Sequence, residues 1–196
     1  MAKDDWFIVE CFLNDLDATL ALEIATAVLQ AQQNRSPLIL SYTMNCVDVD
    51  VFVRLGIVLV FDVLNPYEFV WLPLSDFMRI LELRRQLSSE EQVLELCPLM
   101  SFVALQSPRC KAYALLLAVL EDPLRAGHLR DYLHALAQKD RTDPLISQSQ
   151  VIVDQLSVTL STDEQSNVAS ITAEIRRVTD LMTSECKSVF AGPSDL

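Results

Sequence analysis

Glycine is scarce in this sequence. Its 196 residues include three glycines, Gly56, Gly127 and Gly192, which lie far apart. Phosphate-binding loops, dinucleotide-binding fingerprints and nucleophile elbows each need several glycines close together. The sequence therefore contains none of these glycine-dependent loops. Tight two-residue hairpins also favour glycine, so a large antiparallel sheet is not expected.

Histidine and basic charge are also scarce. His128 and His134 are the two histidines, and their spacing of six on one predicted helix is not the i, i+4 spacing of a helical zinc site. Lys and Arg number 15 against 27 Asp and Glu, which gives a net charge of −12. A nucleic-acid backbone attracts clustered basic residues, and no region here is strongly basic. We therefore expect no metal, no cofactor, no nucleic-acid partner and no enzymatic activity.

Long uncharged apolar runs are missing as well. The longest strongly apolar stretch is Ala112–Leu120, which is much shorter than the roughly 20 residues that a membrane-spanning helix needs. The first ten residues lack the charged-then-apolar pattern of a signal peptide. The five cysteines are odd in number and widely spaced, which favours free buried thiols in a reducing compartment. These features predict a cytoplasmic or nuclear protein that does not bind membranes.

Apolar periodicity and helix-start signals are abundant. Hydrophobic residues make up 51% of the chain, which predicts a folded protein with a large core. Residues 5–33 have the three-four spacing of an amphipathic helix, with a break near Asn14–Asp15 where Asp15 could start a second helix. In the C-terminal half, a capping side chain precedes proline three times, at Ser107-Pro108, Asp122-Pro123 and Asp143-Pro144. The predicted helices there span 108–121, 123–139 and 144–156.

Residues 163–189 form the clearest predicted helix. Ser161 and Glu164 match a capping box, in which each side chain satisfies the other's backbone N–H. Apolar residues then follow a heptad-like spacing that Glu185 alone interrupts. We expect this apolar stripe to pack on the protein's own core. A seam that faces a partner or a second copy of the chain is the alternative.

The stretch from Val47 to Val63 gives conflicting signals. Every odd position in it is apolar, and this period of two favours strands. However, Asn45 is a suitable N-cap and Asn65-Pro66 is a typical helix stop. We predict a buried helix over 46–64, with strands as the alternative.

The fold class that these patterns predict is mainly α. We expect a compact helical bundle or a short helical-repeat-like array, with minor β structure in residues 38–73, and an α+β fold as the alternative. Further helices are predicted at 75–87 and 88–96. Residues 1–190 are expected to form a single helical-rich domain, followed by a flexible tail at 191–196.

The function that fits best is a non-catalytic protein–protein interaction module, such as an adaptor, scaffold or regulatory subunit of a complex. One alternative is a small enzyme whose site is assembled from dispersed residues, for example Asp48, Asp50 and a histidine. Those two aspartates would share one face of a strand, but no acidic cluster nearby in the sequence completes a cation shell, so solvated carboxylates are expected. A second alternative is a viral or bacterial effector that binds a host protein.

Five residues are the candidates for partner binding. Aromatic and arginine side chains commonly anchor interfaces, which selects Trp6, Phe7, Arg176 and Arg177. Leu196 ends the chain two residues after Ser194, a pattern that domains binding free C-termini recognise. The partners would be other proteins or a second copy of the chain in a homodimer.

Overall fold

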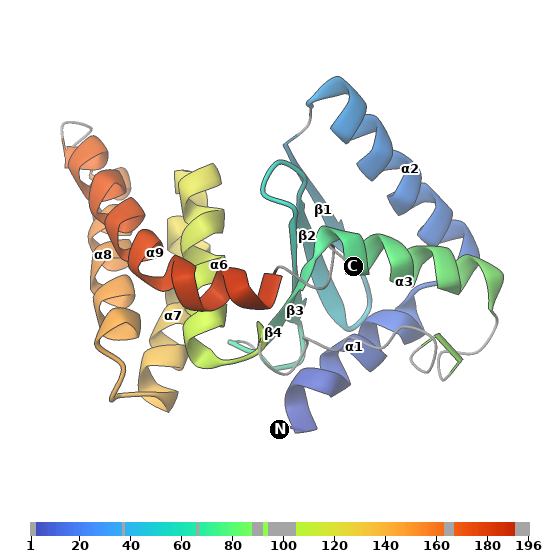
Figure 1. Cartoon of the computed structure of the whole chain (residues 1–196), viewed down its shortest axis with the longest axis horizontal. Helices are drawn as coiled ribbons and strands as arrows, with labels where there is room; N and C mark the ends of the chain where they lie inside the picture. Colours follow the sequence, from blue (N-terminus) through green and yellow to red (C-terminus); the bar gives the residue numbers. More distant parts are fainter. Residues whose placement is uncertain are drawn as a thin grey trace. The chain divides into compact units, whose positions relative to one another are not determined.

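The computed structural model describes residues 3–36, 38–65, 67–87, 92–93, 105–162 and 167–190. Helices dominate this part of the chain, with one small antiparallel sheet, so the prediction of a mainly α fold with minor β structure is confirmed (Figure 1). Backbone contacts divide the chain into two compact units, unit 1 from Met1 to Val103 and unit 2 from Ala104 to Leu196. The single domain over 1–190 stays a prediction, and the tail at 191–196 lies outside the described residues.

Unit 1 begins with two helices, α1 (Lys3–Asp15) and α2 (Ala18–Asn34). The predicted break is present, but Asp17 and not Asp15 caps the second helix, because its carboxylate accepts a 2.8 Å hydrogen bond from the backbone N–H of Leu20. Asp15 instead accepts a 2.7 Å hydrogen bond from the backbone N–H of Cys46. This contact joins the end of α1 to the turn between the first two strands of the sheet.

The sheet consists of four strands, β1 (Ile39–Thr43), β2 (Val47–Phe52), β3 (Ile57–Asp62) and β4 (Phe69–Pro73), each antiparallel to the next along the chain. The prediction of a helix over 46–64 is therefore wrong, and the strand alternative is correct. Gly56 lies in the turn between β2 and β3. Its φ is +69°, and its N–H donates a hydrogen bond to the Phe52 carbonyl.

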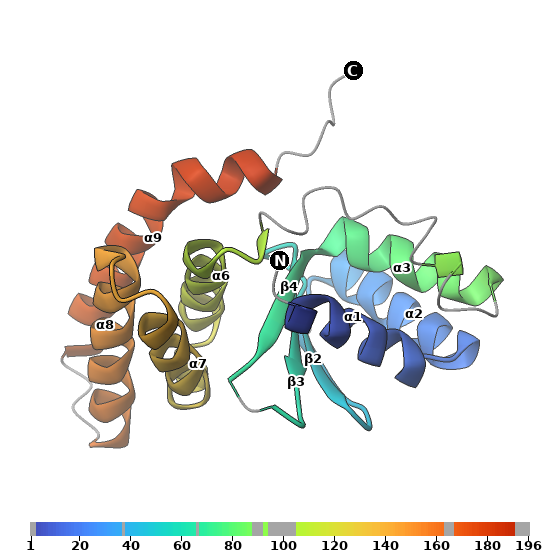
Figure 2. The ribbon, with the colours of Figure 1, turned by 90° about the horizontal axis from the view of Figure 1, so that it is seen from below.

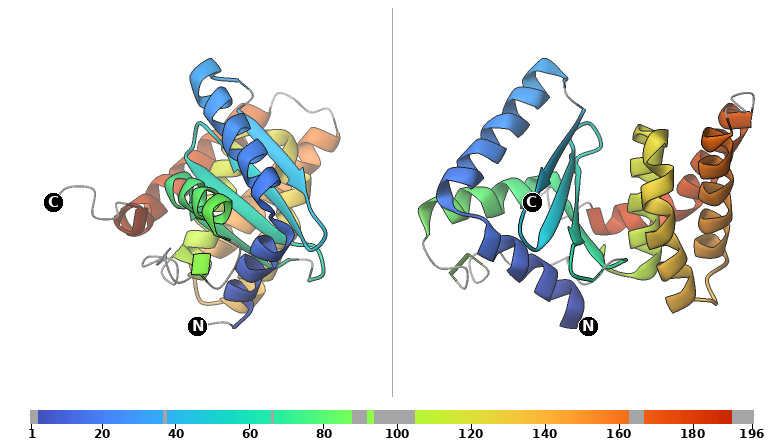
Figure 3. Two further views of the ribbon diagram at one scale, coloured as in Figure 1. Left: turned by 90° about the vertical axis from the view of Figure 1, so that its right-hand side faces the viewer. Right: turned by 180° about the vertical axis from the view of Figure 1, so that it is seen from behind.

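The core of unit 1 lies between the sheet and the helices. Val47, Val49 and Val51 point to one face of β2 and pack in a buried cluster with residues of α1, α2 and α3 (Leu74–Gln86). Figure 2 and the right-hand view of Figure 3 show these three helices on one side of the sheet. Helix α3 agrees with the predicted helix at 75–87. Most of the helix predicted at 88–96 lies outside the described residues.

Unit 2 is a helical bundle of α6 (Pro108–Glu121), the short 3-10 helix η1 (Pro123–Arg125), α7 (Ala126–Lys139), α8 (Pro144–Ser161) and α9 (Val168–Phe190). All three predicted start signals are confirmed, because Ser107, Asp122 and Asp143 accept hydrogen bonds from backbone N–H groups of the following turn. The helix predicted from 123 starts with the 3-10 turn, and α8 continues five residues beyond its predicted end at 156.

Helix α9 packs its apolar stripe within unit 2. Ile175, Val178 and Met182 are fully buried, and α9 contacts both α6 and α8, so the expected packing on the protein's own core is confirmed. The predicted capping box is wrong. Ser161 is the last residue of α8, and its hydroxyl donates a hydrogen bond to the Val158 carbonyl instead of capping the next helix.

Candidate functional site

A groove of about 440 Å³ opens in unit 1 where α2 ends. Ala31 and Gln32 of α2 line one side, Leu38 and Val53 form the side made by the sheet, and two arginines, Arg35 and Arg54, complete the lining. The end of α2, the start of β1 and the β2–β3 turn meet at this end of the unit (Figure 1). The groove is thus an opening between a helix and the sheet that it covers.

Local backbone structure fixes this end of unit 1. Arg35 ends α2 in a left-handed conformation, with φ of 54°, and its N–H bonds to the carbonyl of Ala31. The chain then turns back into β1, and the N–H of Val53 donates a 2.9 Å hydrogen bond to the Leu38 carbonyl. These bonds hold both arginines beside the same apolar floor.

The apolar floor of the groove continues the core of unit 1. Ala31 is buried, and Val53 is a partly buried side chain that packs against the core cluster. Leu38 is 39% exposed although it is apolar. An apolar side chain from another molecule would therefore contact core residues directly when it enters the groove.

The electrostatics of the groove differ from those of the chain as a whole. Arg35 and Arg54 are both exposed, in a protein whose net charge is −12. A guanidinium binds a carboxylate or a phosphate through a rigid fork of donors. The lining thus combines an apolar floor with donors for an anionic group.

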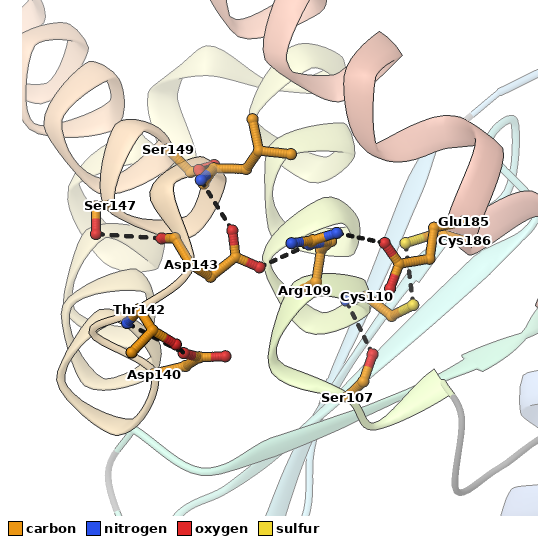
Figure 4. A network of polar contacts seen from close by, with 11 residues as sticks. Ser107, Arg109, Cys110, Asp140, Thr142, Asp143, Ser147, Ser149, Glu185 and Cys186 are labelled. Atoms are coloured by element: carbon orange, nitrogen blue, oxygen red, sulfur yellow. Dashed lines mark hydrogen bonds and ion pairs between the residues drawn. The ribbon is translucent and has the colours of Figure 1, made fainter.

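A second polar site lies in unit 2, where Arg109 joins three helices (Figure 4). Its guanidinium, near the start of α6, makes a 2.6 Å contact with Asp143 at the start of α8 and a 2.5 Å contact with Glu185 of α9. Burial raises the pKa of Asp143, but hydrogen bonds from Arg109 and from the Leu145 backbone outweigh it, so the pKa is lowered overall. The same pairing raises the pKa of Arg109. This network links the starts of α6 and α8 to α9.

The predicted partner-binding residues on α1 have different environments. Trp6 is partly buried and packs against the core cluster of unit 1. Phe7 is 49% exposed. Phe7 therefore keeps the surface position that an interface anchor needs, whereas Trp6 contributes to the fold, and partner binding by either stays a prediction.

Arg176 and Arg177 both lie on the exposed side of α9, as expected. Arg177 makes a two-pronged ion pair of 2.6 and 2.8 Å with Glu174, which also accepts a hydrogen bond from Gln148 of α8. Leu196 lies outside the described residues. Partner binding by these three residues stays a prediction.

The two aspartates of the alternative enzyme site lie in unit 1 and both histidines lie in unit 2, and the enzyme alternative stays a prediction. Asp50 is buried in β2 and accepts a 2.6 Å hydrogen bond from the Ser41 hydroxyl, so it is not a solvated carboxylate as expected. His134 contacts Asp154 of α8 at 2.9 Å, and the His128 ring stacks edge-on with Tyr132. Across the part of the chain that the structure describes, no three His, Cys, Asp or Glu side chains gather as a metal site would require.

Sequence reasoning missed the groove. Arg35 follows the amphipathic helix predicted at 5–33, and Arg54 belongs to the stretch that we assigned to a buried helix. The available signal was an arginine beside apolar residues in a protein with little basic charge. That signal points to a site only when the fold brings both arginines together.

No protein-family model matches the chain, and searches of curated proteins and of solved structures find no similar protein. Among the helices of the described residues, none has the length and apolar character needed to cross a membrane.

Proposed function

We propose that this protein is a non-catalytic protein–protein interaction module, and that the groove in unit 1 binds an acidic, apolar segment of a partner protein. The observation that carries the proposal is the lining itself, an apolar floor beside Arg35 and Arg54 in a strongly acidic chain. An adaptor, a scaffold and a regulatory subunit all act through surfaces of this kind. An effector that binds a host protein would use it in the same way.

The floor supplies the apolar part of binding. Burying a leucine-sized side chain contributes about 1.5–3 kcal/mol, and the groove volume of about 440 Å³ accommodates such a side chain. Ala31 belongs to the buried core, and Val53 packs against it. The entering side chain would thus complete the packing at the open end of the core, as interface anchors commonly do.

The arginines supply selectivity. The chain carries a net charge of −12, and the two arginines that line the groove, Arg35 and Arg54, would attract an acidic segment there. Complementary charge of this kind steers association and disfavours wrong partners. The proposed ligand therefore carries an Asp or Glu next to its apolar anchor.

The outer face of α2 extends the proposed surface. Leu22 and Leu29 are 46% and 48% exposed, and their spacing of seven places them on the same side of the helix. Large exposed apolar side chains in a row favour contact with another protein. A partner segment that enters the groove beside Gln32 would meet Leu29 one turn earlier on α2.

Selection from a random-peptide display library against the immobilised full chain tests this function. The selected peptides are expected to contain a large apolar residue within two positions of Asp or Glu. Arg35→Glu and Arg54→Glu should each weaken binding of a synthetic consensus peptide about tenfold, which corresponds to about 1.4 kcal/mol. Leu38→Asp should weaken it as well, because it places a carboxylate on the apolar floor.

Arg85→Glu is the matched control. Arg85 is also an exposed arginine of unit 1, and its ion pair with Glu82 is a surface i, i+3 pair of small energetic value. The control should bind the peptide as the wild type does. Selected peptides without acidic residues, or equal losses for Arg35→Glu and Arg85→Glu, would contradict the proposal.

A further inference from the structure

Two buried thiols of unit 2 touch each other. The sulfur atoms of Cys110 and Cys186 are 3.0 Å apart, although 76 positions separate the two residues in the sequence. Both side chains are buried, and both cysteines are free. Figure 4 shows the two sulfur atoms facing each other between α6 and α9.

From this geometry we propose that Cys110 and Cys186 form an oxidation site, in which a peroxide converts the two thiols into a disulfide that links α6 to α9. A disulfide needs sulfur atoms about 2.05 Å apart, so they must approach by about 1 Å from their present 3.0 Å. Helices α6 and α9 already pack against each other. The bond would therefore form within an existing contact between the two helices.

The surroundings of Cys110 favour its thiolate. The residue lies in the first turn of α6, where its N–H donates to the capping hydroxyl of Ser107, and free N–H groups at a helix start stabilise negative charge. The hydrogen bond with Cys186 is the largest cause that lowers the pKa of Cys110 to about 7, and Ser107 and Arg109 lower it further against the effect of burial. The same partnership raises the pKa of Cys186.

Cys110 and Cys186 have different roles in the proposed reaction. The Cys110 thiolate attacks one oxygen of hydrogen peroxide, the O–O bond breaks, and the released hydroxide takes up the thiol's proton to become water. The sulfur of Cys186 then attacks the resulting sulfenic acid and loses its own proton, and the hydroxyl leaves as a second water. The two thiols lose two electrons in total, and one peroxide accepts both.

Cys11 and Cys46 of unit 1 provide an internal comparison. Both are free and only partly buried. Burial is the largest cause that raises the pKa of Cys11, and the negative charges of Cys46, Asp62 and Asp15 add to it. A raised thiol pKa slows reaction with peroxide because less thiolate is present. Exposure alone would favour oxidation of these thiols, whereas the proposed mechanism favours the buried pair.

The test treats the reduced full chain with one equivalent of hydrogen peroxide, blocks the remaining thiols in denaturant and maps the tryptic peptides. The expected product joins the peptide 110–111 to the peptide 178–187 with loss of two hydrogens. Because the bond closes a long loop, the melting temperature should rise by about 5–15 °C and return to its initial value after reduction. Cys110→Ala and Cys186→Ala should remove both effects, and Cys11→Ala should retain them.

The pH dependence of alkylation gives a second readout that does not depend on variants. The rate for Cys110 with a small haloacetamide should rise with a midpoint near pH 7, well below the midpoint for Cys11. Three results would overturn the proposal: a bond that joins other cysteines, oxidation of Cys110 to sulfinic acid without a bond, or no reaction under conditions in which the denatured chain forms disulfides.

Discussion

Replacing Gly56 with alanine tests the turn of the β2–β3 hairpin, a region in which the sequence analysis predicted a helix. Gly56 has φ of +69°, and an added Cβ would meet nothing within 4 Å, so a steric clash contributes no energy. An alanine in the left-handed conformation destabilises the folded state by about 1–2 kcal/mol. The same substitution lowers the conformational entropy of the unfolded chain, which stabilises the protein by about 0.4–1 kcal/mol. We expect Gly56→Ala to lower the free energy of unfolding by about 1 kcal/mol.

Gly127→Ala is the matched control with the opposite sign. Gly127 lies in the first turn of α7, and an added Cβ would make an ordinary 3.5 Å contact with the hydroxyl of Ser157. Alanine favours a helix over glycine, and the gain in a first turn is at most about 0.5 kcal/mol. The same chemical change is thus expected to destabilise one unit and slightly stabilise the other.

Urea unfolding measures the stability changes of Gly56→Ala and Gly127→Ala with two spectroscopic probes. Both tryptophans, Trp6 and Trp71, belong to unit 1, so tryptophan fluorescence reports on that unit. Circular dichroism reports mainly on the helices. A Gly56→Ala variant whose fluorescence transition equals or exceeds that of the wild type would refute the left-handed turn and the reasoning built on it.

Three further outcomes follow from unit 2. Arg109 lowers the pKa of Asp143, so this pair stabilises the fold above the unfolded pKa of about 3.9 and the contribution disappears as pH falls through the lower folded value; Asp143→Asn should flatten the acid limb of a stability–pH curve. Arg177→Ala should leave the urea unfolding transition close to that of the wild type, because its pair with Glu174 is solvent-exposed. Met182→Ala should cost about 2–5 kcal/mol in the same assay, because that side chain is fully buried.

Helix starts could be predicted because their determinants are local. Ser107, Asp122 and Asp143 each bond to a backbone N–H two or three residues away, so the sequence contains both partners of the interaction. The same logic failed at Ser161, where the preceding helix α8 continues through the capping signal. Packing of α8 on its neighbours decides that boundary, and packing is not visible in a four-residue motif.

Residues 47–62 could not be assigned with the same rules because strands need distant partners. The side chains of β3 from Ile57 to Phe61 are apolar on both faces and buried, so the segment resembles a buried helix in composition. Its period of two was the correct signal, and Gly56 was sufficient for the turn. The capping residues Asn45 and Asn65 misled the prediction because turns and helix ends favour the same side chains.

The candidate sites depend on tertiary structure even more strongly. Arg35 follows α2 and Arg54 follows β2, and they line one groove only because the sheet folds back against the helices. Cys110 and Cys186 meet across 76 positions through the packing of α6 on α9. By contrast, the exposure of Arg176 on α9 was predictable from helical periodicity alone.

A double-mutant cycle between the groove and a selected peptide tests the central claim most directly. The affinities of the wild type and Arg54→Gln for the peptide and for its Asp→Asn form are measured by isothermal titration calorimetry, and the cycle is repeated with Arg35→Gln. The account predicts a coupling energy of about 1 kcal/mol for at least one arginine, because a guanidinium and a carboxylate would pair beside the apolar floor. Coupling of zero for both arginines, with the peptide still bound, would contradict the assignment of this groove as the partner-binding site.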